Sequence, residues 1–285
     1  MNEKQRFTRR YFLRLMMGSA AAAGISTLGG LGYAGLVEAH WLALQHVDIP
    51  WSATHPLQGD DFTIVQLSDL HRGPVMTAEH ITRAVNLALG QSPDLAVLTG
   101  DYVSESADYA VSCAEALSPL TAHCPVLACL GNHDHWTDAE RVTQALTDVR
   151  ITVLRNTAQN VADGLWVAAV DDVWERHADL DLALESVPAD ATIVLLAHEP
   201  DYADRVAQDG RVHLQLSGHS HGGQVRIPLI GPPALPYLAH KYHSGRHRIG
   251  SLWLYVNRGV GMIQPAVRLN CRPEVTRLRL RAPTG

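Results

Sequence analysis

The sequence predicts an α/β fold for residues 40–285, behind an N-terminal targeting segment. Short apolar runs rich in β-branched residues alternate with amphipathic runs of helical spacing, and polar motifs directly follow several of the apolar runs. With 285 residues, 46% of them apolar, the chain is long enough to bury a large core as one domain.

Residues 1–39 are predicted to direct export rather than to join the fold. Thr8–Leu13 reads Thr-Arg-Arg-Tyr-Phe-Leu and resembles the twin-arginine export signal of bacteria, whose machinery moves folded proteins. A charge-free run over 15–37 follows, long enough to span a bilayer with its basic flank in the cytoplasm. An ordinary membrane anchor is the alternative. Val37-Glu38-Ala39 is a weak cleavage site, so removal and retention as an anchor both stay open. Either way, we expect the domain in the periplasm or on the outer face of the cytoplasmic membrane.

Beyond this segment, strands and helices are expected to alternate. A strand over 41–49 alternates in polarity, whereas 62–67 and 94–98 are apolar runs typical of buried strands. Further strands are predicted over 125–130, 165–170, 191–197, 212–216, 252–257 and 275–280. Helices are predicted over 77–91, 107–117, 138–149 and 200–208. In the first helix Ile81, Val85 and Leu89 share one face, and Thr77 is placed as the N-cap.

Five polar motifs follow predicted strands in a fixed order. They are Asp69-Leu-His71, Gly100-Asp101, Gly131-Asn132-His133-Asp134, His198, and Gly218-His219-Ser220-His221. Loops at the carboxyl ends of strands are where α/β folds place their sites, so the motifs are expected to converge. Their oxygen and imidazole groups suffice for two divalent ions that share one bridging ligand. Such ligands suit Mn, Fe or Zn and do not separate these metals.

These motifs, in this order and strand context, resemble the calcineurin-like metallophosphoesterase family over about residues 57–281. The stretches 217–233 and 257–261 further resemble a bacterial subgroup, the exported or membrane-anchored phosphodiesterases related to UDP-2,3-diacylglucosamine pyrophosphatases. The resemblance implies a four-layer αββα sandwich of two mixed sheets.

The resemblance also implies a role for each matched residue. Asp69, His71 and His221 would hold one metal ion, Asn132, His198 and His219 would hold the second, and Asp101 would bridge both. A water that bridges two dications loses a proton near neutral pH and becomes a nucleophile. His133 would donate a proton to the leaving oxygen, and Asp134 is placed to orient that imidazole. Arg72 is a weaker candidate for a phosphate contact, with a surface charge as the equal alternative.

The expected activity is hydrolysis of phosphodiester or pyrophosphate bonds. A phosphomonoesterase or protein phosphatase of the same fold is the nearer alternative, and a non-catalytic metal-bearing adaptor is disfavoured because the ligand set is complete. The net charge of −6 argues against nucleic acid as a partner, since phosphate backbones are bound through clustered Lys and Arg.

Two further features bear on the substrate and the compartment. The apolar stretch Val225–Leu238 follows the last motif and either folds back onto the core or forms an apolar wall beside the metals. In the second case a lipid-linked substrate and a membrane surface are the expected partners. Four cysteines lack any Cys-x-x-Cys pair and are expected to be small buried apolar residues, although a disulfide stays open. They are Cys113, Cys124, Cys129 and Cys271.

Overall fold

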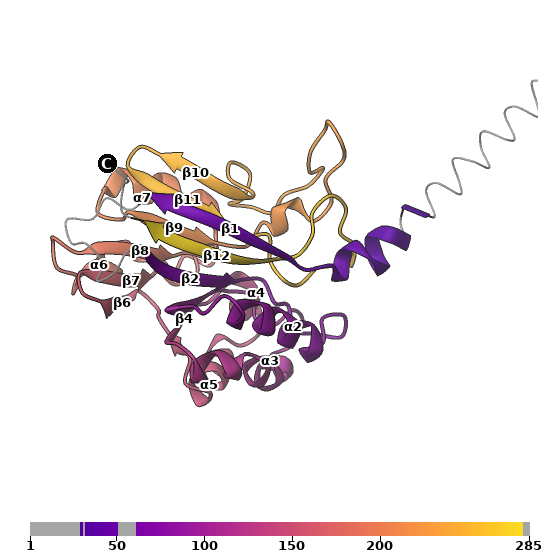
Figure 1. The fold of residues 1–285 in the computed structure, drawn as a ribbon, viewed down its shortest axis with the longest axis horizontal. Coiled ribbons are helices and arrows are strands. Elements are labelled where there is room, and N and C mark those ends of the chain that lie inside the picture. The colour runs from indigo at the N-terminus through magenta and orange to yellow at the C-terminus, as the bar shows by residue number, and fades with distance from the viewer. Residues whose placement is uncertain (1–28, 31, 51–60, 282–285) are drawn as a thin grey trace, which may run out of the picture.

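The computed structural model describes residues 29–30, 32–50 and 61–281, so the motif around Arg9 and Arg10 lies outside the described residues. The described chain forms two six-stranded sheets with helices on their outer faces (Figure 1). None of the helices in those ranges has both the length and the apolar character needed to span a bilayer.

The first sheet is mixed. In spatial order its strands are β1 (Ala43–Pro50), β12 (Glu274–Arg281), β2 (Asp61–Leu67), β3 (Leu95–Thr99), β4 (Val126–Cys129) and β5 (Thr152–Val153). The strands β2 to β5 run parallel, whereas β12 pairs antiparallel with β2 and parallel with β1.

The second sheet is also mixed. Its order is β10 (Gly245–Ile249), β11 (Leu252–Val256), β9 (Leu214–Ser217), β8 (Thr192–Leu196), β7 (Leu165–Ala169) and β6 (Thr157–Ala162). The four inner strands are parallel, and the outer strands β10 and β6 pair antiparallel with their neighbours.

Helices form the two outer layers. The helices α2 (Ala78–Leu89), α3 (Ala110–Leu117) and α5 (Ala139–Asp148) pack on the first sheet, and α6 (Leu180–Leu184) and α7 (Ala203–Asp209) pack on the second. A short helix, α4 (Asn132–Thr137), follows β4. The 3-10 turns are η1 (Glu38–His40), η2 (Ala107–Tyr109), η3 (Ser118–Ala122), η4 (Pro200–Tyr202) and η5 (His221–Gly223).

The alternation of side chains along the strands explains why the sheets stack. In β3, Leu95 and Val97 face the second sheet, whereas Ala96 and Leu98 face the helices. All these side chains are buried, because each sheet is covered on both faces. The four-layer αββα sandwich implied by the sequence is therefore confirmed.

The predicted elements are present, with small differences at their ends. The helix predicted over 107–117 is split into η2 and α3, and α4, α6, β5, β6 and β10 were missed. Thr77 occupies the N-cap position of α2, but its hydroxyl contacts His80 Nδ1 at 2.9 Å rather than capping the helix. All four cysteines are free. Three of them are buried as expected, whereas Cys124 is only partly buried.

Candidate metal centre

The sequence motifs converge at one edge of the sandwich. Asp69, Asp101 and Asn132 follow β2, β3 and β4, which are neighbours in the first sheet. His198 and His219 follow β8 and β9, which are neighbours in the second sheet. The centre is therefore assembled from both sheets, and all five side chains are buried.

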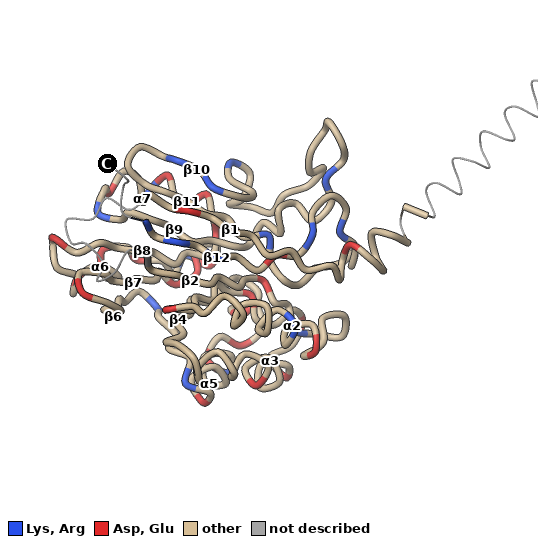
Figure 2. The backbone as a smooth tube through the Cα atoms, in the orientation of Figure 1, with Lys and Arg blue, Asp and Glu red and all other residues tan. Residues whose placement is uncertain are grey.

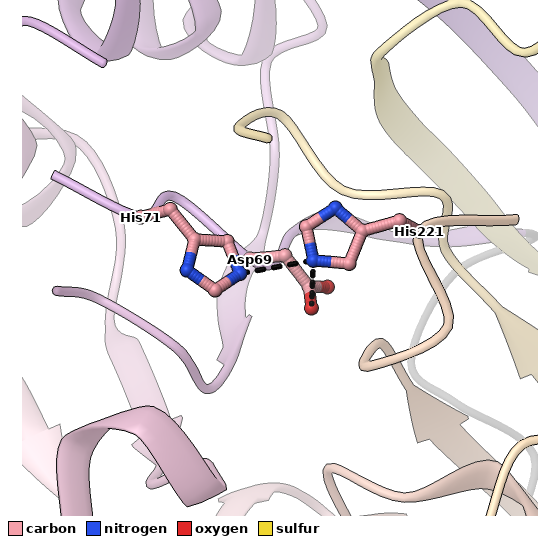
Figure 3. Close-up of side chains that lie close together, drawn as sticks. All are labelled: Asp69, His71 and His221. Atoms are coloured by element: carbon pink, nitrogen blue, oxygen red, sulfur yellow. Dashed lines mark hydrogen bonds and ion pairs between the residues drawn. The ribbon is translucent and has the colours of Figure 1, made fainter. Parts of the chain in front are cut away.

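One group of ligands consists of Asp69, His71 and His221, whose donor atoms lie within 4.8 Å of one another (Figure 3). The Nε2 atoms of the two histidines are 2.9 Å apart, and Asp69 Oδ1 lies 3.4 Å from His221 Nε2. Donor atoms about 2 Å from a common ion lie roughly 3 Å apart, so this spacing matches a coordination shell. The group fits a divalent cation.

A second group consists of Asp101, His198 and His219. His198 Nδ1 donates to the carbonyl of Thr99 at 2.6 Å, which leaves its Nε2 facing Asp101 Oδ2 at 3.2 Å. His219 Nε2 donates in the same way to the Tyr237 carbonyl, which leaves Nδ1 free to bind a metal. Both imidazoles are therefore oriented with the other ring nitrogen toward the centre. Burial lowers the pKa of His198, but the charge of Asp101 and the hydrogen bond to it outweigh burial and raise the pKa well above the usual value, so a bound cation would displace that proton.

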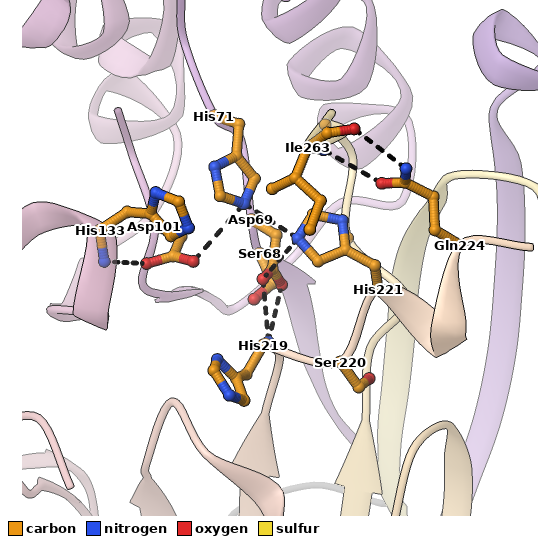
Figure 4. A network of polar contacts seen from close by, with 12 residues as sticks. Ser68, Asp69, His71, Asp101, His133, His219, Ser220, His221, Gln224 and Ile263 are labelled. Carbon is orange, nitrogen blue, oxygen red and sulfur yellow. Dashed lines mark hydrogen bonds and ion pairs between the residues drawn. The ribbon is translucent and has the colours of Figure 1, made fainter. Parts of the chain in front are cut away.

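Asp101 joins the two groups. Its Oδ2 lies 3.5 Å from His71 Nε2, and its Oδ1 accepts the main-chain N–H of His133 at 2.9 Å (Figure 4). The same Oδ2 lies 3.2 Å from His198 Nε2. Burial raises the pKa of Asp101, but the charges and hydrogen bonds of the surrounding histidines outweigh it and hold the pKa well below the usual value. The carboxylate is therefore ionised.

Most of the imidazoles are neutral. Burial lowers the pKa of both His71 and His219 to about 3 and lowers that of His221 well below its usual value. Burial also raises the pKa of Asp69 to about 6, because the carboxylate loses its hydration there. Neutral imidazoles beside dehydrated carboxylates are what a cation requires.

Asn132 fits the same centre. It begins α4, is buried, and its Oδ1 accepts no hydrogen bond among the described residues. A buried amide oxygen without a donor is costly unless it binds something else. A metal ion would supply that partner.

The main chain at the centre is strained. The residues Asp69, His71, Asp101, His219 and His221 all have φ between 48° and 68°. This left-handed region costs a non-glycine residue of order 1–3 kcal/mol and persists where function requires it. Two glycines permit the close approach, because a Cβ on Gly131 would collide with Asp101 and one on Gly218 would collide with Asp69.

The structure corrects the role expected for Asp134. Its carboxylate accepts the main-chain N–H groups of Gly131, Asp101, Tyr102 and Val103. His133 is oriented instead by the carbonyl of Ser104, which accepts from Nδ1 at 3.1 Å. Asp134 is thus a support for the strained loops, and Ser104 is the partner that sequence adjacency did not reveal.

Two other residues differ from the sequence expectation. Arg72 Nη1 donates to the carbonyls of Gly73 and Met76, and the guanidinium lies 4.8 Å from the Tyr109 ring centroid. The guanidinium of Arg72 therefore stabilises the loop that follows it, and the expected phosphate contact is not supported. His133, expected to stay off the metals, also forms a close group with His71 and Asp101.

Comparison with known proteins agrees with this geometry. The profile of the calcineurin-like phosphoesterases matches residues 62–223. YkuE of Bacillus subtilis, an uncharacterised metallophosphoesterase, is 36% identical over 98% of this chain and 99% of its own length. Phosphodiesterase YaeI of Escherichia coli is 35% identical over 96% of this chain and 99% of its own.

The chain belongs to the calcineurin-like phosphoesterase family. It is a metal-dependent hydrolase of phosphoric esters. A dimetal phosphatase from Danio rerio has the same fold, with a TM-score of 0.50 and 11% identity over 73% of this chain and 90% of that one.

This phosphoesterase also has a residue near the metals that the sequence did not disclose. Arg268 is completely buried, and its guanidinium donates to the carbonyls of Arg258, Gly259, Gly261 and Cys271. The loop held in this way donates from Gly261 N to the Asp69 carbonyl at 2.7 Å. Arg268 therefore positions the Asp69 loop, although nothing in its local sequence marks it.

A cavity of about 560 Å³ opens beside the metal ligands of this phosphoesterase. Trp136 and Trp174 line it together with Val225, Pro233 and Leu235. Gln224 holds the walls together, because its amide forms hydrogen bonds with the main chain of Ile263 (Figure 4). The same amide nitrogen also donates to the Pro265 carbonyl. Asp101, Asn132 and His219 lie at the polar end, so the cavity joins the metal centre to an apolar chamber.

Proposed function

We propose that this chain hydrolyses phosphodiester or pyrophosphate bonds with two divalent ions, one in each ligand group. The observation that carries the proposal is the placement of Asp101 between the imidazoles of the two groups. One carboxylate there offsets charge at both positions at once, which suits a pair of ions a few ångströms apart.

The donors fit such ions. They are carboxylate, amide and imidazole groups with no thiolate, a set that suits Mn, Fe or Zn. When bound, such ions activate a water as a nucleophile and polarise the phosphoryl oxygens. Asp69, His71 and His221 would hold one ion, and Asn132, His198 and His219 would hold the other, with Asp101 shared.

His133 is the proposed proton donor. Its Nδ1 donates to the Ser104 carbonyl, so Nε2 is the atom free to deliver a proton to the leaving oxygen. The side chain lines the cavity beside Asp101 and Asn132, which places it next to a phosphate held at the ligands. The apolar walls would exclude water from the leaving group.

The cavity favours an amphiphilic substrate. Its polar end can receive a phosphate, and its tryptophan, proline and leucine walls can receive an apolar group attached to that phosphate. We therefore extend the proposal to lipid-linked phosphodiesters or pyrophosphates.

We also propose export by the twin-arginine machinery to the periplasm or to the outer face of the cytoplasmic membrane. The Arg9-Arg10 pair and the charge-free run after it support this proposal. Replacing both residues with Lys keeps the charge and removes the recognised pair, so the protein should stay in the cytoplasm. Normal export of the Lys-Lys form would favour an ordinary membrane anchor instead.

The activity is tested by metal analysis together with two chromogenic substrates. The purified chain should contain two divalent ions per molecule and should cleave bis(p-nitrophenyl) phosphate faster than p-nitrophenyl phosphate when Mn is supplied. Faster cleavage of the monoester would favour a phosphomonoesterase. Full metal content without turnover of either ester would favour an adaptor.

A further inference from the structure

The sheet topology fixes where the N-terminal segment enters the domain. The strand β1 is parallel to β12, and β12 is antiparallel to β2. The beginning of β1 therefore lies at the same edge as the end of β2, where Asp69 stands. Residues 32–40 accordingly leave the domain at the metal-bearing end, as the dark segment at the right of Figure 1 shows.

The entering segment is packed into the domain. The Ala34 carbonyl accepts from Arg268 N at 3.0 Å, and the buried Glu38 carboxylate accepts from Cys271 N at 2.6 Å. Ala39 is 1% exposed. Two residues of the weak cleavage site, Glu38 and Ala39, are therefore buried, and removing residues 1–39 would strip hydrogen bonds from the loop that Arg268 holds.

Large apolar side chains are exposed around the same end. In the loop after η5, Leu229 and Ile230 are 108% and 75% exposed, and Tyr237 is 58% exposed. Leu36 of the entering segment is 80% exposed, and Ile263 at the cavity wall is 38% exposed. Single exposed apolar residues are ordinary, but a group gathered from three segments at one end indicates a binding surface.

The charge of this end agrees with a lipid surface. The segments 225–238 and 259–270 contain no Asp or Glu, and their only charged residues are Arg226 and the buried Arg268. In Figure 2 the loop after η5, at the upper right, carries blue and no red. Anionic headgroups would therefore meet no acidic side chain on these two segments.

We propose that these exposed residues form a rim, made of Leu36, Leu229, Ile230, Tyr237 and Ile263, that docks on a lipid bilayer. The entering segment 32–40 leaves the domain at this same end, so the cavity would open toward the membrane. A substrate would then present its phosphate to the metals while its acyl chains leave the membrane only partly. The docking does not depend on the proposed function, which enters only through this choice of substrate.

The docking is tested with the full chain in nanodiscs of phosphatidylethanolamine and phosphatidylglycerol. An environment-sensitive fluorophore is attached to Leu229→Cys and, as a matched control, to Leu182→Cys on α6. Leu182 is 52% exposed at the opposite end of the sheets, and a Cys124→Ala background removes the half-buried native thiol. The label at 229 should be quenched by lipid-attached quenchers and protected from iodide, and the label at 182 should show the reverse. Equal iodide quenching at both positions overturns the proposal. Using His133→Ala, which should keep both ions and lose turnover, for the same measurement keeps it independent of catalysis.

A second measurement separates docking from chemistry. The Leu229→Ser/Ile230→Ser variant should cleave p-nitrophenyl hexadecyl phosphate in vesicles at least about tenfold more slowly and should cleave p-nitrophenyl methyl phosphate normally. Neither side chain lines the cavity. Lipid contact at 229 without turnover of either diester would contradict the proposed function but not the docking. Unchanged turnover of both diesters by the Leu229→Ser/Ile230→Ser variant, together with a water-exposed label in Leu229→Cys, would contradict the docking but not the function.

Discussion

The metal centre and the apolar chamber beside it are built in opposite ways. The centre consists of side chains that directly follow strands, held by strained main chain and hydrogen bonds to carbonyls. The chamber is made by side chains from α4, the turn after β7, and the loops 225–238 and 263–265. The first arrangement fixes the position and direction of each donor atom, and the second fixes only the shape and polarity of the walls. Substitutions in the metal centre should therefore reduce metal content or turnover, whereas substitutions in the chamber should change only the substrate preference.

The largest effect is expected at Asp101. Asp101→Asn keeps the size of the side chain but removes the charge shared by both ligand groups. Both ions should be lost, and turnover should fall by more than about 10²-fold, the loss that even an outer-shell change can produce. Metal analysis and initial rates measure this, with the exposed Asp108→Asn as the control. Two ions per chain in Asp101→Asn would contradict the shared-ligand assignment.

The next effect separates a proton donor from a ligand. His133→Ala should lower turnover by roughly 10² to 10⁴ and leave the metal content intact, as loss of a general acid does. His219→Ala should lower the metal content as well. His133 also lies in a group with His71 and Asp101, so equal metal loss in both variants would make His133 a ligand instead.

The chamber should respond in substrate preference alone. Leu235→Ser places a hydroxyl on the apolar wall, so KM for p-nitrophenyl hexadecyl phosphate should rise by about tenfold, or about 1.4 kcal/mol of binding. Metal content should not change, because Leu235 belongs to no ligand group. Leu182→Ser at the far end serves as the control. An equal rise in KM for the methyl ester would point to damage at the metal centre.

The smallest effect is a pH-dependent loss of stability near the chamber wall. His135 precedes Trp136 on α4, and its Nε2 lies 2.8 Å from Asp171 Oδ1. Burial lowers the pKa of His135, but the hydrogen bond to Asp171 and the charge of Asp171 raise it by more than burial lowers it. The net pKa of His135 is therefore raised. The stability that protonated His135 adds to the fold is therefore complete below the unfolded pKa of about 6.5. It is lost as pH rises through the pKa of His135 in the folded protein.

His135→Gln should accordingly lower the melting temperature more at pH 5.5 than at pH 8.5. After allowance for solvent screening we expect about 1 kcal/mol at the lower pH, or roughly 2–4 °C. Thermal unfolding at the two pH values measures it, with His46→Gln on β1 as the control. A larger loss at pH 8.5 would show that His135 acts by packing and not by charge.

The ligands could be predicted because each one belongs to a short motif next to a strand. The order of the apolar runs was enough to place Asp69, Asp101 and His198 at one edge of the sheets. Trp174 and Arg268 could not be predicted, since their roles depend on contacts between segments far apart in the chain. Asp134 shows the limit of adjacency, because α4 turns its carboxylate toward main-chain N–H groups and away from the neighbouring imidazole.

Each ligand group joins residues of the two sheets, which lie far apart in the sequence. His71 and His221 are 150 positions apart, and a common ion would tie them together. Such an ion acts as a cross-link that closes a very long loop, the role a disulfide plays in many exported proteins. All four thiols of this chain are free. Chelation should therefore loosen the packing between the two sheets at the metal-bearing end. The chain should then be cleaved by proteases more readily.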